Sequence, residues 1–161
     1  MWVANGPSPC AAGKYTSIGV DSSGDPHISY YDAGNGDLKY AYIDGTSGWT
    51  LLTVDGSSSL VGSEGTSLVV DSNDDVHISY YSFTNENLKY ATNAGGSWTV
   101  MTADSPDRVG MYSSLAVDSG GHVHISYYDE TNGNLKYATY DGSSWSNSTI
   151  DDSTDDVGMF T

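Results

Sequence analysis

Three histidines and three lysines recur at matching places in the sequence. The segment "DPHISYYDAGNGDLKYA", which begins at Asp25, is repeated as "DVHISYYSFTNENLKYA" and "HVHISYYDETNGNLKYA". Histidine can transfer protons or bind metals near neutral pH. A catalytic histidine, however, needs an orienting partner at one substrate-facing position, which a residue repeated in every unit does not provide. We therefore expect structural roles for His27, His77, His124, Lys39, Lys89 and Lys136.

The histidines are expected to lie between neighbouring units, each bonded to a serine, tyrosine or backbone group of its neighbour. The lysines are expected to pair with carboxylates or to pack their stems on tyrosine. Two alternatives stay open. The histidines could form a ring that binds a metal or an anion, and the lysines could present repeated cationic groups to an acidic ligand.

One tryptophan follows a Gly/Ser turn in each unit. An exposed tryptophan can stack on the apolar face of a sugar ring, while nearby Asp, Asn and Tyr bind its hydroxyls. Repetition would make such a site multivalent. Alternatively, the tryptophans seal the outer edge of a unit or the contact between units. The candidate ligand-binding residues are Trp49, Trp98, Trp145, Tyr31, Tyr81 and Tyr128.

Motifs for catalysis are missing from the sequence. It has no nucleophile elbow, HExxH motif, phosphate loop or CxxC pair, so we expect no enzyme activity and no cofactor. The segments "DSSGD" and "DSNDD" resemble calcium loops, but the third copy, "DSGGH", loses a carboxylate. Hairpin turns capped by Asp explain all three copies, and we expect no metal. Any asymmetric site would have to draw on the residues that break the repeat, which are Glu64, Glu86, Glu130, Arg108 and His122.

The repeated residues lie on segments that read as β-strands. In the second segment, Ile28 and Tyr30 alternate with His27, Ser29 and Tyr31, which is the period of two expected for a strand. Asn-Gly pairs and Gly/Ser/Asp clusters connect the segments and supply the positive φ angles of tight hairpins. Each unit is therefore predicted to be a four-stranded antiparallel meander of about 48 residues.

A single such sheet cannot hide two apolar faces, but radial stacking of several sheets can. The sequence therefore predicts an all-β protein with a β-propeller fold, whose blades usually have this length. The segment "SIGVDSSGDPHISYYD" resembles the first hairpin of NHL-type and related propellers, and "DGSSW" resembles blades of lectin propellers. The WD40 pair and the Ser-x-Asp-x-Gly-x-x-Trp box of sialidase-like propellers are missing. The resemblance implies a fold rather than one activity.

The repeat divides the chain into blades. Residues 1–12 are predicted to be the tail and linker of a preceding blade, and residues 157–161 an overhang into a following one. The three blades are predicted at 13–62, 63–109 and 110–156. Three blades cannot close a ring, since propellers have four to eight. We expect a homodimer that closes a six-bladed ring; alternatively, the chain is a piece of a longer propeller.

The composition narrows the possible partners. The net charge is −16, with only 5 Lys and Arg residues, which disfavours nucleic acid and anionic membranes. Cys10 is the single cysteine, so no internal disulfide is expected. The localisation stays open, with an extracellular setting favoured if a secretion signal has been removed.

The sequence favours a non-catalytic, lectin-like propeller that binds carbohydrate at equivalent sites. One alternative is a repeat scaffold without a small-molecule ligand. Another is a fragment of a larger propeller hydrolase or lyase.

Overall fold

The computed structural model describes residues 12–43, 45, 48–56, 60–154 and 156–159. They form three four-stranded antiparallel sheets, in each of which the strands follow chain order. The first blade holds β1 (Ala12–Val20), β2 (Pro26–Asp32), β3 (Asp37–Ile43) and β4 (Trp49–Asp55). The second holds β5 (Val61–Val70), β6 (Val76–Ser82), β7 (Asn87–Thr92) and β8 (Thr99–Asp104). The third holds β9 (Val109–Val117), β10 (Val123–Asp129), β11 (Asn134–Tyr140) and β12 (Trp145–Asp151).

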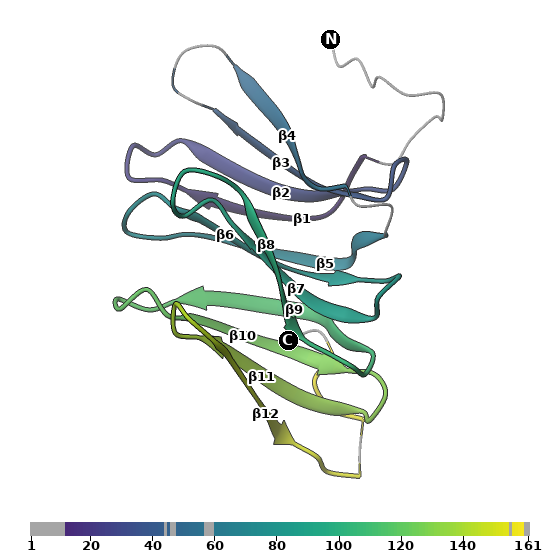
Figure 1. Cartoon of the computed structure of the whole chain (residues 1–161). Helices are drawn as coiled ribbons and strands as arrows, with labels where there is room; N and C mark the ends of the chain where they lie inside the picture. The colour runs from purple at the N-terminus through teal and green to yellow at the C-terminus, as the bar shows by residue number, and fades with distance from the viewer. Residues whose placement is uncertain (1–11, 44, 46–47, 57–59, 155, 160–161) are drawn as a thin grey trace.

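The blades stack face to face in the order of the chain, from β1–β4 to β9–β12 (Figure 1). The predicted all-β class and four-stranded antiparallel blades are confirmed. The strands β5 and β9 begin at Val61 and Val109, slightly before the predicted starts of the second and third blades. The predicted tail, apart from Ala12, and Cys10 lie outside the described residues. The described part contains no helix long and apolar enough to cross a membrane.

Apolar side chains from two blades meet in each interface. A blade packs on the preceding blade through its leading face and on the following blade through its trailing face. Leu68 lies on the leading face of the second blade, and Leu38 lies on the trailing face of the first. Between the first two blades, Leu38 and Tyr40 pack in one cluster with Leu68, Ile78 and Tyr80. Ile78 and Tyr80 are two residues apart on β6, so both point to the same face. The period of two in the sequence therefore supplies the core.

Three polar contacts accompany this packing, and each occurs in both interfaces. A serine on the first strand of a blade, which we call the inner strand, accepts a hydrogen bond from the next blade's backbone. Ser17 Oγ accepts from the Leu68 amide at 3.0 Å in this way. Two hydroxyls meet across the interface, and a tyrosine donates to the aspartate that ends the preceding blade. The second interface forms these contacts through the pairs Ser67–Leu115 (3.0 Å), Ser79–Ser113 (2.9 Å) and Tyr127–Asp104 (2.6 Å).

Each linker docks on the blade that it leaves. The amide of Val109 donates to the Glu86 carbonyl at 3.0 Å, and Val61 donates to Gly36 in the same way at 3.1 Å. The glycine after each valine has a positive φ and lies against a buried leucine. At Gly110 (φ +107°) a Cβ atom would lie 2.6 Å from the Leu88 Cα atom. Only glycine fits here, because both the backbone conformation and the space exclude a side chain.

We predict that Gly110→Ala destabilises the protein by at least about 3 kcal/mol, since the linker must move off Leu88. Gly142→Ala is the matched control, because Gly142 has a similar φ of +92° but no atom within 4 Å of the added Cβ. It should cost only about 1 kcal/mol, the strain of a left-handed backbone. Urea unfolding measures both values, and equal costs would contradict the packing argument.

Candidate functional site

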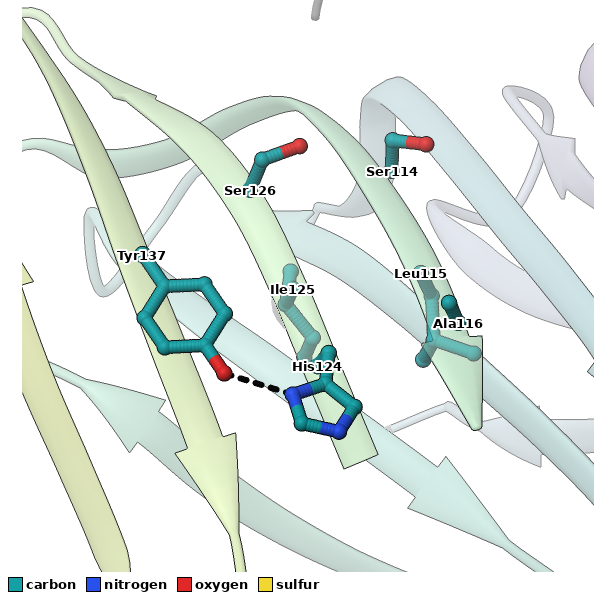
Figure 2. A pocket seen from close by; sticks show the side chains of 7 residues that line it. All are labelled: Ser114, Leu115, Ala116, His124, Ile125, Ser126 and Tyr137. Atoms are coloured by element: carbon teal, nitrogen blue, oxygen red, sulfur yellow. Dashed lines mark hydrogen bonds between the residues drawn. The ribbon is translucent and has the colours of Figure 1, made fainter. Parts of the chain in front are cut away.

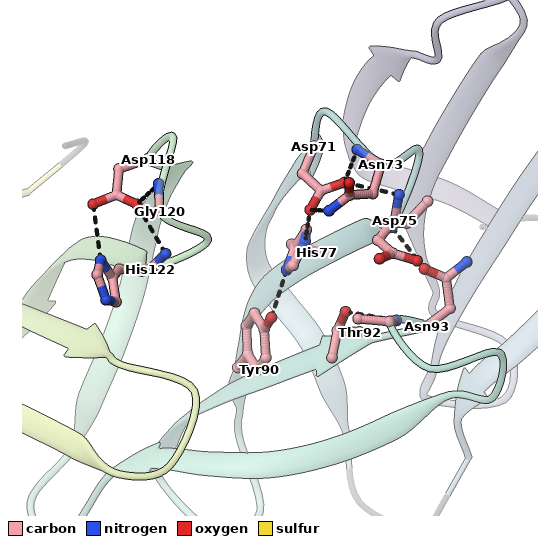
Figure 3. A network of polar contacts seen from close by, with 12 residues as sticks. Asp71, Asn73, Asp75, His77, Tyr90, Thr92, Asn93, Asp118, Gly120 and His122 are labelled. Atoms are coloured by element: carbon pink, nitrogen blue, oxygen red, sulfur yellow. Dashed lines mark hydrogen bonds and ion pairs between the residues drawn. The ribbon is translucent and has the colours of Figure 1, made fainter.

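A row of three side chains in contact, an aspartate, a histidine and a tyrosine, recurs in all three blades; we call it the Asp–His–Tyr chain. In the second blade, His77 Nδ1 lies 2.5 Å from the Tyr90 hydroxyl, and Nε2 lies 3.5 Å from Asp71 Oδ2 (Figure 3). The register places His77 opposite Thr92 on β7, with Tyr90 two residues further back on the same face. The equivalent chains are Asp21–His27–Tyr40 and Asp118–His124–Tyr137. The histidines therefore bond a tyrosine of their own blade, not a group of the neighbouring blade as expected.

The aspartate of each chain also caps a turn. Asp71 Oδ1 accepts hydrogen bonds from the amides of Asn73 at 2.8 Å and Asp75 at 3.0 Å. Burial alone would raise the pKa of Asp71, but these two amides and His77 outweigh it, and the pKa is lowered. Asp71 is thus ionised at neutral pH and holds the imidazole from one side.

Burial sets the charge state of the other two groups. It lowers the pKa of His77, although Asp71 partly opposes this effect. Burial also raises the pKa of Tyr90 to about 12. A neutral imidazole fits this arrangement: Nε2–H faces Asp71 at 3.5 Å, and Nδ1 accepts a hydrogen bond from the Tyr90 hydroxyl. The chain fixes the tyrosine as a neutral hydrogen-bonding group.

The second chain borders a cleft between the second and third blades. This cleft has a volume of about 360 Å³. We call it the blade 2–3 cleft; its walls include His77, Tyr90, Thr92 and Met101 of the second blade and Val123 and Tyr140 of the third. The backbone of two turns, at Gly121 and Gly142, also lines it. The six named side chains offer hydroxyls, aromatic rings and apolar groups, and none is charged at neutral pH.

Thr92 is one of the side chains in which this cleft differs from the equivalent place in the first interface. Thr92 takes the position that Tyr42 occupies there, since each lies opposite the histidine of its blade. The Tyr42 ring stacks on His27 at 6.2 Å and on Tyr40 at 5.3 Å. The shorter threonine leaves that space open beside His77.

The third blade carries half of a similar cleft on its trailing face. A hollow of about 220 Å³ there is lined by residues that include His124, Tyr137, Ser114 and Ser126. Figure 2 shows the hydrogen-bonded His124 and Tyr137 rings on β10 and β11, with the two serine side chains further along β9 and β10. His124 is exposed in 36% of its side chain, compared with 6% for His77. The difference arises because, among the described residues, no blade packs on His124 as the third blade packs on His77.

The structure places two of the three predicted tryptophans at the blade interfaces. Trp98 and Trp145 meet Tyr40 and Tyr90 of the preceding blade edge to face, at 5.1 and 5.4 Å. Trp49 has no preceding blade among the described residues and is 41% exposed. A role of these rings in sugar binding stays a prediction.

The predicted tyrosines lie apart from the tryptophans. Tyr31, Tyr81 and Tyr128 are buried near the other ends of β2, β6 and β10. Burial raises the pKa of Tyr31 and Tyr81, and a hydrogen bond to Asp156 raises that of Tyr128 to about 12. The structure does not bring the predicted tyrosines and tryptophans together into one site.

The lysines lie on the leading faces. Lys136 donates to Asp104 of the preceding blade at 2.6 Å and lies 5.8 Å from the Tyr127 ring centre. Lys39 donates to Thr53 of its own blade at 2.7 Å. Lys89 lies opposite Tyr80 in the register of β6 and β7. The expected pairing with a carboxylate is thus seen for Lys136.

Residues outside the repeat form a different cluster. Arg108 binds Glu86 at 3.1 Å and Glu130 at 2.6 Å. Its backbone carbonyl also accepts the Glu130 amide at 2.9 Å, so the cluster holds a linker to a hairpin. Within the described ranges, no three His, Cys, Asp or Glu side chains gather to hold a metal.

Several residues of the blade 2–3 cleft are not among the predicted site residues, namely Tyr90, Thr92, Met101 and Tyr140. One signal was present in the sequence. The repeat position after "LKYA" reads Tyr42 in the first copy and Thr92 and Thr139 in the others. That position decides whether the space beside the histidine is filled.

Comparison with other proteins gives a fold but no family. The sequence matches no protein-family model and no curated protein. A family 43 β-1,3-galactosidase, solved with galactodeoxynojirimycin, is similar with a TM-score of 0.56 and 12% identity, over 83% of this chain and 56% of that one. An exo-β-1,3-galactanase from Phanerochaete chrysosporium, solved with β-1,3-galactotriose, has a TM-score of 0.54 and 13% identity, over 84% and 35%.

A fucose lectin from Kordia zhangzhouensis, solved with methyl-fucoside, is also similar. Its TM-score is 0.48 and its identity 21%, over 83% of this chain and 96% of that one. The two enzymes are β-propellers, and the likeness to them confirms the predicted propeller architecture. This chain spans about half of the galactosidase and about a third of the galactanase. The resemblance to NHL-type propellers finds no support in these matches.

We predict that His77 makes the protein less stable in mild acid. Because burial lowers the pKa of His77, an unfolded chain takes up its proton near pH 6.5 while the folded chain resists it. The contribution of the neutral ring is complete above that pH and declines as the pH falls below it. The difference in unfolding free energy between wild type and His77→Gln should therefore shrink between pH 7 and pH 5. Urea titrations at each pH measure it, and a constant difference would refute the assignment.

Proposed function

We propose that this protein is a non-catalytic binding propeller and that its ligand is a neutral carbohydrate held in the blade 2–3 cleft. The observation that carries the proposal is the lining of that cleft. Its hydroxyls and neutral imidazole suit sugar hydroxyls, and its tyrosine rings suit the apolar face of a pyranose. The volume of about 360 Å³ falls within the usual range of ligand sites.

The state of the Asp71–His77–Tyr90 chain supports binding rather than turnover. A nucleophilic tyrosine requires a lowered pKa or a base that removes its proton. Here burial raises the pKa of Tyr90 to about 12 and lowers that of His77. The chain therefore keeps the phenol protonated and oriented, which suits a group that hydrogen-bonds a ligand.

The uncharged lining of the cleft also favours a neutral sugar over an acidic ligand. The ammonium group of Lys136 is bound to Asp104, and Lys136 is not among the residues that line the cleft. An anion in the cleft would find no cation there and would lie near the ionised Asp71. We infer that ligands with a carboxylate or phosphate group bind more weakly than neutral sugars.

Filling the cleft provides the test. Thr92→Tyr introduces the residue that stands at the equivalent position of the first blade, Tyr42, where the ring stacks on the histidine of its blade. Binding of neutral mono- and oligosaccharides, with methyl-fucoside and β-1,3-galactotriose among them, is measured by calorimetry. Thr92→Tyr should weaken the best ligand at least about tenfold, because its ring occupies the sugar's place.

Thr102→Tyr is the matched control, since Thr102 lies on the same blade at an exposed position outside the cleft lining. It should leave the affinity unchanged. If the wild type binds no sugar of the panel, or binds one equally well in both variants, the protein is better described as a repeat scaffold without a ligand in this cleft.

A further inference from the structure

Within the part of the chain that the structure describes, the two outer faces of the three-blade stack are uncovered halves of an interface that forms twice between the blades. Ile18, on the leading face of the first blade, is 64% exposed, whereas Leu68 at the same position of the second blade is 5% exposed. Ile150, on the trailing face of the third blade, is 59% exposed, whereas Ala103 at its position is 3% exposed. Large apolar side chains in water at both ends call for a partner.

The hydrogen-bonding groups of these two faces match as donors and acceptors. The trailing face of the third blade presents Ser114, at the position where Ser67 accepts the Leu115 amide. The corresponding amide on the first blade belongs to Ile18. Likewise, the positions of the hydroxyl pair Ser79–Ser113 are taken by Ser126 on the third blade and Thr16 on the first.

Their charges match as well. Asp104 ends the second blade and accepts from Lys136 and Tyr127 of the next blade, each at 2.6 Å. Asp151 ends the third blade at the same position. The donors that correspond to Lys136 and Tyr127 on the first blade are Lys39 and Tyr30. A first blade placed against Asp151 would bring both donors to it.

We propose that the trailing face of the third blade binds the leading face of the first blade of a second copy. The third blade of the second copy binds the first blade of the first copy in the same way, so that two chains close a six-bladed ring. The occupant is a second copy because its first blade supplies the apolar, hydroxyl and cationic groups that fit this face. Such head-to-tail contacts form a closed ring when the rotation per chain permits it.

The docking of Val157 and Gly158 on the third blade sets where the second copy joins. The Val157 amide already donates to the Gly133 carbonyl at 3.0 Å, and Gly158 lies against Leu135, as Val109 and Gly110 do one blade earlier. The start of the next inner strand is therefore occupied. The second copy's β1 therefore packs on the third blade from Thr16 onward. Its Ala12–Lys14 segment gives up the pairing with Tyr31 and Asp32 that it has here.

The junction would also complete a second ligand cleft, a point that rests on the proposed function. His124 and Tyr137 already line the half-cleft of the third blade. The second copy's Pro26 and Ile43 take the positions of Val123 and Tyr140, which close the blade 2–3 cleft. At the position of Met101 the junction has Ser148, so the lining of the completed cleft differs from that of the blade 2–3 cleft. A ring would then hold two clefts of each kind.

Sedimentation equilibrium with a charge exchange tests the junction. The wild type should have twice the chain mass of 17.1 kDa at micromolar concentration. Asp151→Lys and Lys39→Asp should each raise the dimer dissociation constant roughly 100-fold, since each leaves like charges facing one another. The double variant should recover the dimer to within about tenfold of the wild type. Asp152→Lys, an exposed charge reversal next to Asp151, should leave the dimer intact.

A monomeric wild type, an open-ended ladder of masses, or a double variant no better than the single ones would overturn this inference. Saturation binding by calorimetry tests the second cleft: the dimer should bind two sugars per chain, and the monomeric Asp151→Lys variant one. One sugar per chain in the dimer would overturn the completed cleft. A closed dimer that binds no sugar would overturn the proposed function and leave the junction standing.

Discussion

The need to cover both faces of every blade governs this structure. A four-stranded sheet that presents Leu68, Ile78 and Tyr80 on one side cannot remain in water, so it packs against the preceding blade. Apolar contact alone would not fix how the blades align, because it has no direction. The serine–amide, hydroxyl–hydroxyl and tyrosine–aspartate contacts supply that direction. They recur in both interfaces because residues at the same repeat positions make them, so the repeated sequence determines how the blades align.

The same repetition explains how a cleft arises without a dedicated insertion. The Asp–His–Tyr chain holds each blade's turn against its third strand, leaving one position beside the imidazole to be filled or left open. Tyr42 fills it in the first blade, and Thr92 leaves it open in the second. The difference between Tyr42 and Thr92 is thus one of the changes between copies that leave a lined cleft in the second interface, while the surrounding fold stays the same.

The fold was accessible from the sequence because it depends on alternation and turn chemistry, which are local. The alternation of Ile28 and Tyr30 with His27 and Ser29 along one segment suffices to predict the strand and its two faces. The site was less accessible, because it depends on which side chains meet across neighbouring strands and between blades. The histidine's tyrosine partner lies on the next strand of the same blade, which spacing alone does not reveal. The sequence left open whether the tryptophans bind sugar or seal the contact between blades; Trp98 and Trp145 meet tyrosines of the preceding blade.

The central claim is that a neutral sugar enters the blade 2–3 cleft, and amide chemical shifts test it most directly. In a titration with D-galactose, L-fucose, D-mannose and D-glucose followed by ¹⁵N-resolved NMR, at least one sugar should shift the amides of Gly121 and Gly142, which line this cleft. The amide of Gly62, which packs on Leu38 away from the cleft, should stay in place. Shifts confined to other parts of the protein, or none with any of the four sugars, would contradict the account.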